Sequence, residues 1–262
     1  MTETVPYAVP ALALVALVGS LFGSFANVAI HRVPLGRSVV RPRSACPSCG
    51  TALSGIENVP VLSWLALRGR CRHCQARISV RYPLVELATA AVWVLLAMKI
   101  GLKPELPAYL AFGTTLVILT AIDFAVHRLP NKVLSWASLV GLVLFALATL
   151  VRWDLRPFLH GVEGMFLFGI PMIVIGIVSG GNMGWGDVKF APYLGFHLGW
   201  LRIGYVPLGA FMGFVFGAVV GALLMALGSA GRKTQIAFGP YMALGALVCI
   251  LAGDTILRIW FP

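Results

Sequence analysis

The chain has 262 residues, of which 59% are hydrophobic and only 11% are charged, and its mean hydropathy is +0.91. Soluble domains carry about 25% charged residues, so this composition excludes an ordinary soluble domain, a disordered chain and a small disulfide-rich secreted module. Twenty Lys and Arg against nine Asp and Glu give a formal net charge of +11. Nine of these basic residues fall between Ile30 and Tyr82. We therefore interpret the charge as that of a cytoplasmic loop beside an anionic lipid bilayer, and we expect no nucleic acid as a partner.

Eight apolar segments follow one another along the chain. A helix needs about 20 residues to cross a bilayer, and most of the segments reach that length. They cover residues 5–30, 83–100, 106–126, 133–151, 157–179, 187–201, 203–229 and 235–260. The sequence therefore predicts an all-α polytopic membrane protein with about eight transmembrane helices. The expected domains are a first helix over 1–30, a cytoplasmic loop domain over 31–82 and a seven-helix membrane domain over 83–262.

The start of the chain predicts a retained helix and not a cleaved signal peptide. Residues 1–10 contain Glu3 and no Lys or Arg, whereas a signal peptide begins with a basic region. If the N-terminus lies outside the cytoplasm, the cytoplasmic loops hold 13 basic residues and the opposite loops hold six. This asymmetry follows the positive-inside rule, so we expect both termini on the non-cytoplasmic side.

Four cysteines form two closely spaced pairs, Cys46-Pro-Ser-Cys49 and Cys71-Arg-His-Cys74, with 21 residues between the pairs. Two CxxC pairs can close a tetrahedral site of four thiolates around Zn²⁺. A redox-active pair and unrelated thiols are the alternatives, although disulfides do not persist in a reducing compartment. Because four cysteine ligands leave no open coordination position, we expect a structural zinc that holds the loop domain together.

Two acids fall where an ionised carboxylate is costly. Asp123 follows the apolar run 116–122, and Asp187 closes Gly184-Trp-Gly-Asp187 at the start of an apolar segment. Insertion of an acid into a span costs about 2.5–3.5 kcal/mol, which makes such a residue a functional candidate. Pairing of each acid with a Lys or Arg is the alternative. The predicted topology places both at similar depth on the cytoplasmic side, which favours a pair of catalytic carboxylates.

Such a pair has a defined chemistry. Facing carboxylates cannot both ionise cheaply, so they share one proton. One can then act as general base toward a water while the other donates to a carbonyl oxygen, as in peptide hydrolysis without a covalent intermediate. Gly184 and Gly186, in a loop that continues to Lys189, would let a substrate backbone approach Asp187 and pair with the loop as a strand. A flexible turn is the alternative for a GxGD tetrapeptide taken alone.

Taken together, these features resemble the type IV prepilin peptidases, which are membrane aspartyl proteases of the GxGD class. The resemblance covers nearly the whole chain. Besides the acids and the two cysteine pairs, it rests on Gly23-Ser-Phe-Ala-Asn-Val28, residues 78–86, Leu129-Pro130, residues 184–189 and Phe238-Gly-Pro240. Two positions depart from it, because Asn131 stands where many relatives have Asp and Ala237 stands where Pro often occurs.

The resemblance implies two activities in one chain of a bacterial inner membrane, with periplasmic termini. Asp123 and Asp187 would remove the basic leader of prepilins or pseudopilins on the cytoplasmic side. A methyltransferase activity that uses S-adenosylmethionine would then methylate the new N-terminal residue. In the family this second activity is associated with the N-terminal signature and the cysteine-bearing domain. The matching residues in this chain are Gly23, Ser24, Asn27 and Gly69.

Three other functions remain open from the sequence. A leader peptidase without methyltransferase activity is the nearest, and the cysteine-bearing domain argues against it. A proton-coupled transporter with a zinc-stabilised loop would tend to place its acids at several depths along one path. A non-catalytic membrane scaffold would leave both acids unexplained.

Overall fold

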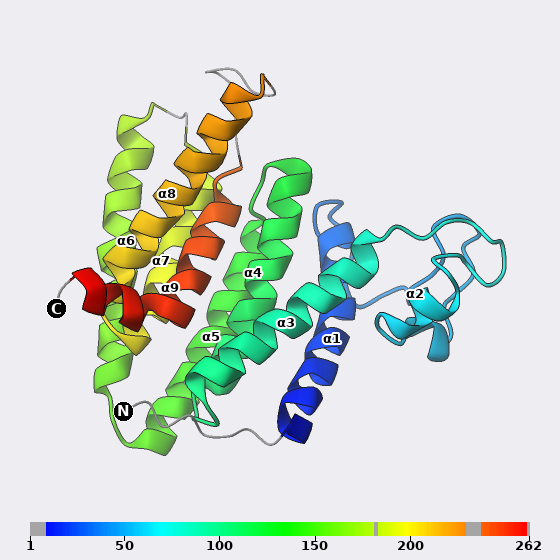
Figure 1. Cartoon of the computed structure of the whole chain (residues 1–262), viewed down its shortest axis with the longest axis horizontal. Helices are drawn as coiled ribbons and strands as arrows, with labels where there is room; N and C mark the ends of the chain where they lie inside the picture. The colour runs from blue at the N-terminus through cyan, green and yellow to red at the C-terminus, as the bar shows by residue number, and fades with distance from the viewer. Residues whose placement is uncertain (1–8, 181–182, 229–236, 261–262) are drawn as a thin grey trace. The chain divides into compact units, whose positions relative to one another are not determined.

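The computed structural model describes residues 9–180, 183–228 and 237–260 (Figure 1). The described part is helical apart from loops, with two isolated β-bridges, Ala45–Ala52 and Arg70–Arg77, and no β-strand. This confirms the predicted all-α class. The chain divides into two compact units, Met1–Leu102 and Lys103–Pro262.

The first unit consists of two long helices and the polar loop between them. Helices α1 (Val9–Arg32) and α3 (Arg81–Ile100) lie side by side (Figure 1). The loop contains the short helices η1 (Ile56–Asn58) and α2 (Leu62–Ala66). α1 and α3 approach closely at Gly19, where an added Cβ would lie 3.1 Å from the Cα of Ala90. Small residues of this kind allow helices in membranes to pack backbone against backbone.

In its described residues, the second unit is a bundle of six helices. They are α4 (Leu106–Val126), α5 (Asn131–Arg152), α6 (Arg156–Val178), α7 (Trp185–Leu201), α8 (Tyr205–Ala226) and α9 (Gly239–Trp260). α6 and α7 form the closest pair, because a Cβ on Gly195 would collide with the carbonyl oxygen of Gly164. The core of the unit contains the fully buried Tyr109 and Phe112 of α4 and Leu194 of α7.

Local sequence signals explain where several of these helices begin and end. Pro107 and Pro157 lie in the first turns of α4 and α6, where the missing N–H of proline costs no hydrogen bond. α3 ends at Gly101, which has φ +82°, a conformation that suits glycine. α4 ends at His127, whose backbone is left-handed and donates its N–H to the Asp123 carbonyl oxygen at 2.8 Å.

Among the described helices, seven are long and apolar enough to cross a membrane, namely α1, α3, α4, α5, α6, α8 and α9. The chain is therefore a multi-pass membrane protein. The remaining predicted span, 187–201, corresponds to α7, which has 17 residues, fewer than the ~20 of a straight crossing. Eleven of these 17 residues are buried, so α7 is surrounded by protein along most of its length. The predicted helix ends at 5–8 and 229–236 lie outside the described residues.

Candidate active site and metal centre

The two intramembrane acids meet at one end of the second unit. Asp123 lies in the last turn of α4 and Asp187 in the first turn of α7, so both side chains leave their helices at the same end. Both are buried, with exposed fractions of 4% for Asp123 and 9% for Asp187. The two carboxyl groups interact electrostatically, and Oδ2 of Asp123 has no hydrogen-bond partner. The fold therefore brings together the two acids that the sequence pairs.

A third helix contributes a backbone donor to this pair. Gly239 is the first residue of α9, and its N–H interacts with both carboxyl groups. A Cβ added to Gly239 would lie 2.8 Å from Oδ2 of Asp123 and 3.2 Å from Cδ1 of Leu129. Glycine at this position therefore allows the α9 backbone to approach the acids.

The glycines of the 184–187 turn are also closely packed. Gly184 is the N-cap of α7, and a Cβ there would lie 3.1 Å from Oδ2 of Asp187. A Cβ on Gly186 would lie 2.9 Å from Cβ of Leu129. The Leu129 side chain therefore occupies part of the space that we expected the glycine to leave for a substrate. Lys189 is exposed and donates a hydrogen bond to Oδ1 of Asn131 at 3.3 Å. That this turn binds the substrate stays a prediction.

The contact at Gly239 leads to a mutational prediction. Gly239→Ala should lower peptide cleavage by up to about 10²-fold, since a displacement of the reacting groups by ~1 Å can cost that much. The added methyl group must move either Asp123 or Leu129. Gly204→Ala is the matched control, because its Cβ would only contact Leu257 at 3.7 Å. Initial cleavage rates of both variants test the expectation, and equal activity of Gly239→Ala and Gly204→Ala would contradict it.

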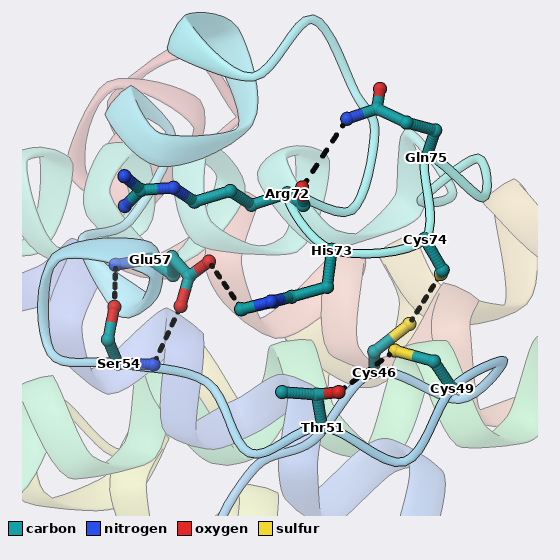
Figure 2. Close-up of polar contacts among 9 residues, drawn as sticks. All are labelled: Cys46, Cys49, Thr51, Ser54, Glu57, Arg72, His73, Cys74 and Gln75. Atoms are coloured by element: carbon teal, nitrogen blue, oxygen red, sulfur yellow. Dashed lines mark hydrogen bonds and ion pairs between the residues drawn. The ribbon is translucent and has the colours of Figure 1, made fainter.

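Four cysteines form a cluster in the loop of the first unit. The sulfur atoms of Cys46, Cys49, Cys71 and Cys74 all lie within 4.8 Å of one another, and all four are free thiols. The Cys46 and Cys74 sulfurs are 3.8 Å apart, and Figure 2 shows both beside the sulfur of Cys49. Four sulfurs at about 2.3 Å from one zinc ion in a tetrahedron are roughly 3.8 Å from one another. The cluster therefore has the geometry to hold a metal ion.

Both CxxC pairs lie in tight turns of the same design. The N–H of Gly50 donates to the Cys46 carbonyl oxygen at 2.9 Å, and the N–H of Gln75 donates to that of Cys71 at 3.0 Å. Gly50 and Gln75 each follow the second cysteine of a pair, and both have positive φ, +71° and +58°. Each turn directs the sulfurs of its two cysteines toward one point.

The surroundings of the cluster favour the thiolate of Cys49 and brace the loop. Hydrogen bonds with Thr51 lower the pKa of the Cys49 thiol to about 6. Ser54 and Glu57 form a reciprocal pair, in which each backbone N–H donates to the other side chain (Figure 2). Hydrogen bonds from Ser54 hold the pKa of Glu57 below its usual range, with the larger effect from the Ser54 N–H and the smaller from its hydroxyl group. Oε1 of Glu57 lies 3.7 Å from Nε2 of His73, so this carboxylate also contacts the second CxxC turn.

Two of the residues predicted for methylation contact one buried acid. A Cβ on Gly23 would lie 2.6 Å from Cα of Glu86, and the Ser24 side chain hydrogen-bonds to the Glu86 carboxyl group. Glu86 also accepts the N–H of Val61 at 2.7 Å. Val61 has φ +60°, and the N–H of the next residue, Leu62, donates to the carbonyl oxygen of Pro60. Residues 60–62 therefore form a strained γ-turn. Gly23 and Ser24 thus belong to the contact that joins α1, α3 and the loop.

The other two predicted residues make contacts beside and within the same loop. Nδ2 of Asn27 donates to the carbonyl oxygen of Tyr82 at 2.9 Å. Gly69 has φ +67°, and a Cβ there would lie 2.8 Å from the ring of Trp64. That ring donates its Nε1–H to the carbonyl oxygen of Ile78 at 3.1 Å. These contacts give the residues structural roles, and their role in methylation stays a prediction.

Three buried polar residues are not distinguished by the sequence. Two of them are the acids Glu86 and Glu105, which are both buried. Glu105 accepts a 2.7 Å hydrogen bond from Arg152, which balances its charge. His197 is 2% exposed, and its Nε2 has no partner. The ion pair of Glu105 has one sequence signal, which is the basic residue Arg152 at a matching depth. No signal in the sequence indicates that His197 is buried.

Two protein families match the chain in succession. The Bacterial Peptidase A24 N-terminal domain matches residues 17–100, and the Type IV leader peptidase family matches residues 110–227. The first match covers the cysteine loop, α3 and the second part of α1, and the second match covers both acids. None of the solved structures matches the chain.

The chain is also similar to several curated proteins that are named prepilin leader peptidase/N-methyltransferase. The protein of Aeromonas hydrophila is 34% identical over 290 residues, which cover 95% of this chain and 92% of the relative. The protein of Bacillus subtilis is 30% identical over 249 residues, which cover 95% of this chain and 97% of the relative. That of Myxococcus xanthus is 42% identical over 223 residues, which cover 84% of this chain and 65% of the relative. With these identities over nearly its whole length, the chain belongs to the type IV leader peptidase family.

Proposed function

We propose that the chain is a bifunctional enzyme that removes the basic leader of type IV prepilins or pseudopilins and then N-methylates the new N-terminal residue. The observation that carries the proposal is the buried pair of Asp123 and Asp187, which three helices of the second unit hold together. The names of the curated relatives support both activities. A peptidase without methylation is less well supported, since the matched regions include the N-terminal domain. A transporter is also less well supported, because both acids lie at one end of the bundle.

The acid pair can perform hydrolysis with water as the nucleophile. With one proton shared between Asp123 and Asp187, the ionised carboxylate takes a proton from water while the water oxygen attacks the peptide carbonyl carbon. The protonated carboxyl group donates to the carbonyl oxygen. When the tetrahedral intermediate collapses, the C–N bond breaks and the leaving amine takes up a proton. The Gly239 N–H interacts with both carboxyl groups and can stabilise the negative charge that the pair carries.

We assign a structural zinc ion to the four-cysteine cluster. The sulfur spacing supports this assignment, and four thiolate ligands leave no coordination position for water. The metal would therefore stabilise the loop and take no part in hydrolysis. S-adenosylmethionine supplies the methyl group of the second reaction when it is bound. The residues of the first unit that we associate with that reaction are Gly23, Ser24, Asn27 and Gly69.

The proposed orientation gives a topological prediction. We place both termini in the periplasm and the cysteine loop in the cytoplasm, because the basic residues are concentrated in that loop. A reporter fused after Pro262 should lie in the periplasm, and a reporter inserted at Gly50 should lie in the cytoplasm. A cytoplasmic reporter after Pro262 would show an odd number of crossings and would contradict the inclusion of α7 among them.

One experiment tests both activities. The purified protein is incubated with a full-length prepilin, with and without S-adenosylmethionine, and the substrate N-terminus is identified by mass spectrometry. We expect a shortened product in both samples and one added methyl group only with the methyl donor. An intact substrate would contradict the peptidase assignment, and a shortened product that is never methylated would favour the single-activity enzyme.

A further inference from the structure

A groove at the end of the bundle away from the acids has no part in the reaction described above. It lies between α8 and α9 of the second unit and has a volume of about 520 Å³. One of its lining residues is Arg202, which directly follows α7. Asp187 lies in the first turn of α7, and the helix rises about 21 Å from Asp187 to Leu201. The groove is therefore separate from the acid pair.

The wall of the groove is apolar and extends along α8. Leu208 and Phe211 line it from α8, and Leu257 lines it from α9. Phe211 is six residues beyond Tyr205, where α8 begins, and this separation is a helical rise of about 9 Å. One leaflet contributes about 15 Å to the hydrocarbon core of a bilayer. Because α8 and α9 are long and apolar enough to span a membrane, the groove extends from the helix ends into the acyl-chain region of one leaflet.

Two arginines line the groove where these helices end. Arg202 precedes α8, and Arg258 lies in the last turn of α9. Both are exposed, and none of the described lining residues is acidic. The planar guanidinium group of arginine offers several N–H donors that match the oxygens of a phosphate. Two such groups at one end of an apolar groove are complementary to a ligand with an anionic head and an apolar tail.

A nearby carboxylate balances only part of this positive charge. Asp254 lies four residues before Arg258 on α9, and its Oδ1 is 3.6 Å from Nη1 of Arg202. The Arg202 side chain is still 57% exposed beside this carboxylate. Two arginines and one aspartate leave a net charge of +1, and ion pairs between exposed side chains contribute little to stability. An anionic ligand can therefore compete with Asp254 for Arg202.

We propose that the groove binds an anionic phospholipid of the leaflet away from the acids. The phosphate contacts Arg202 and Arg258, and an acyl chain lies along Leu208, Phe211 and Leu257. An uncharged apolar molecule would leave both arginines without an anion, and free phosphate would leave the apolar wall uncovered. The ammonium group of a zwitterionic lipid would be repelled by the same arginines, so the lining favours a lipid with a net negative charge. In the orientation proposed above, this lipid belongs to the periplasmic leaflet.

Lipid binding to the full chain in detergent tests the proposal. Phosphatidylglycerol and phosphatidylcholine are titrated separately, inorganic phosphate is added as a competitor, and bound lipids are counted by native mass spectrometry. We expect phosphatidylglycerol to bind more tightly than phosphatidylcholine and to resist displacement by phosphate. Arg202→Gln and Arg258→Gln should each weaken phosphatidylglycerol binding about fivefold, the usual contribution of one basic residue near anionic lipid. Arg156→Gln is the matched control, because Arg156 is an exposed arginine at the start of α6 that does not line the groove.

Further variants test the apolar wall and the competing carboxylate. Leu208→Trp fills the groove and should weaken phosphatidylglycerol binding by about tenfold, whereas Val219→Trp, at an exposed position of α8 outside the groove, should leave it unchanged. Asp254→Asn removes the competitor of Arg202 and should strengthen binding, a gain that misfolding cannot produce.

Three results would overturn the proposal. They are equal affinity for the two lipids, displacement of phosphatidylglycerol by inorganic phosphate, and equal effects of Arg156→Gln and the two groove arginine variants. None of these measurements depends on cleavage, so their outcome is independent of the proposed function.

Discussion

Replacement of Asp123 or Asp187 by Asn is expected to lower leader cleavage by at least about 10²–10⁴-fold, the contribution usual for a general acid or base. Asn keeps the volume and hydrogen-bonding capacity of the side chain but cannot take up or share a proton. Because the two acids work as a pair, the double variant should be no less active than either single variant. The loss of uncleaved prepilin over long incubations measures the cleavage rates of the two single variants and the double variant.

The control for this prediction is another acid of the same unit. Glu163 of α6 is exposed, and Glu163→Gln removes a carboxylate without touching the pair. It should cleave at the wild-type rate. Thermal unfolding in detergent should give similar Tm values for all variants, since Asn fits the space of Asp. Near-normal cleavage by a folded Asp187→Asn protein would show that the reaction does not use the acid pair.

The sequence predicts the helices well because their signals are local. Apolar runs, prolines in first turns and residues such as Gly101 after last turns lie within a few positions of the ends that they determine. α4 shows this most directly, since its predicted and observed bounds are both 106–126. α7 is the segment for which length alone misleads, because a helix that protein surrounds does not need the full thickness of a bilayer.

The metal cluster and the acid pair differ in how far the sequence can predict them. Each CxxC turn forms from hydrogen bonds within five residues, so its geometry follows from the local sequence. The acids come from helices that are far apart in the chain, and their predicted proximity depends on the topology. The parts that complete the site depend on tertiary packing alone. The importance of Gly239 is visible only in the structure, where a Cβ added to it would lie 2.8 Å from Oδ2 of Asp123.

The cysteine cluster leads to a prediction that separates the metal from the protease. The purified protein should contain about one zinc ion per chain, and Cys46→Ser or Cys71→Ser should lower that content sharply, since each removes one of four ligands. The loop between α1 and α3 buries few apolar side chains, Cys46 and Cys71 among them, and has two isolated bridges in its described part. We therefore expect it to depend on the metal for its fold. Zinc content by mass spectrometry and protease sensitivity of the loop measure both effects.

The two activities should respond differently to this loss. We expect methylation to fall further than cleavage in Cys46→Ser and Cys71→Ser, because the acids belong to the second unit and the cysteines to the first. Cys249→Ala is the matched control, since it removes a buried cysteine of α9 that is not part of the cluster. It should keep its zinc and its methylation. Full methylation by zinc-free wild-type protein would refute the structural role of the metal, and equal loss of both activities in the two Ser variants would show that the loop serves cleavage as much as methylation.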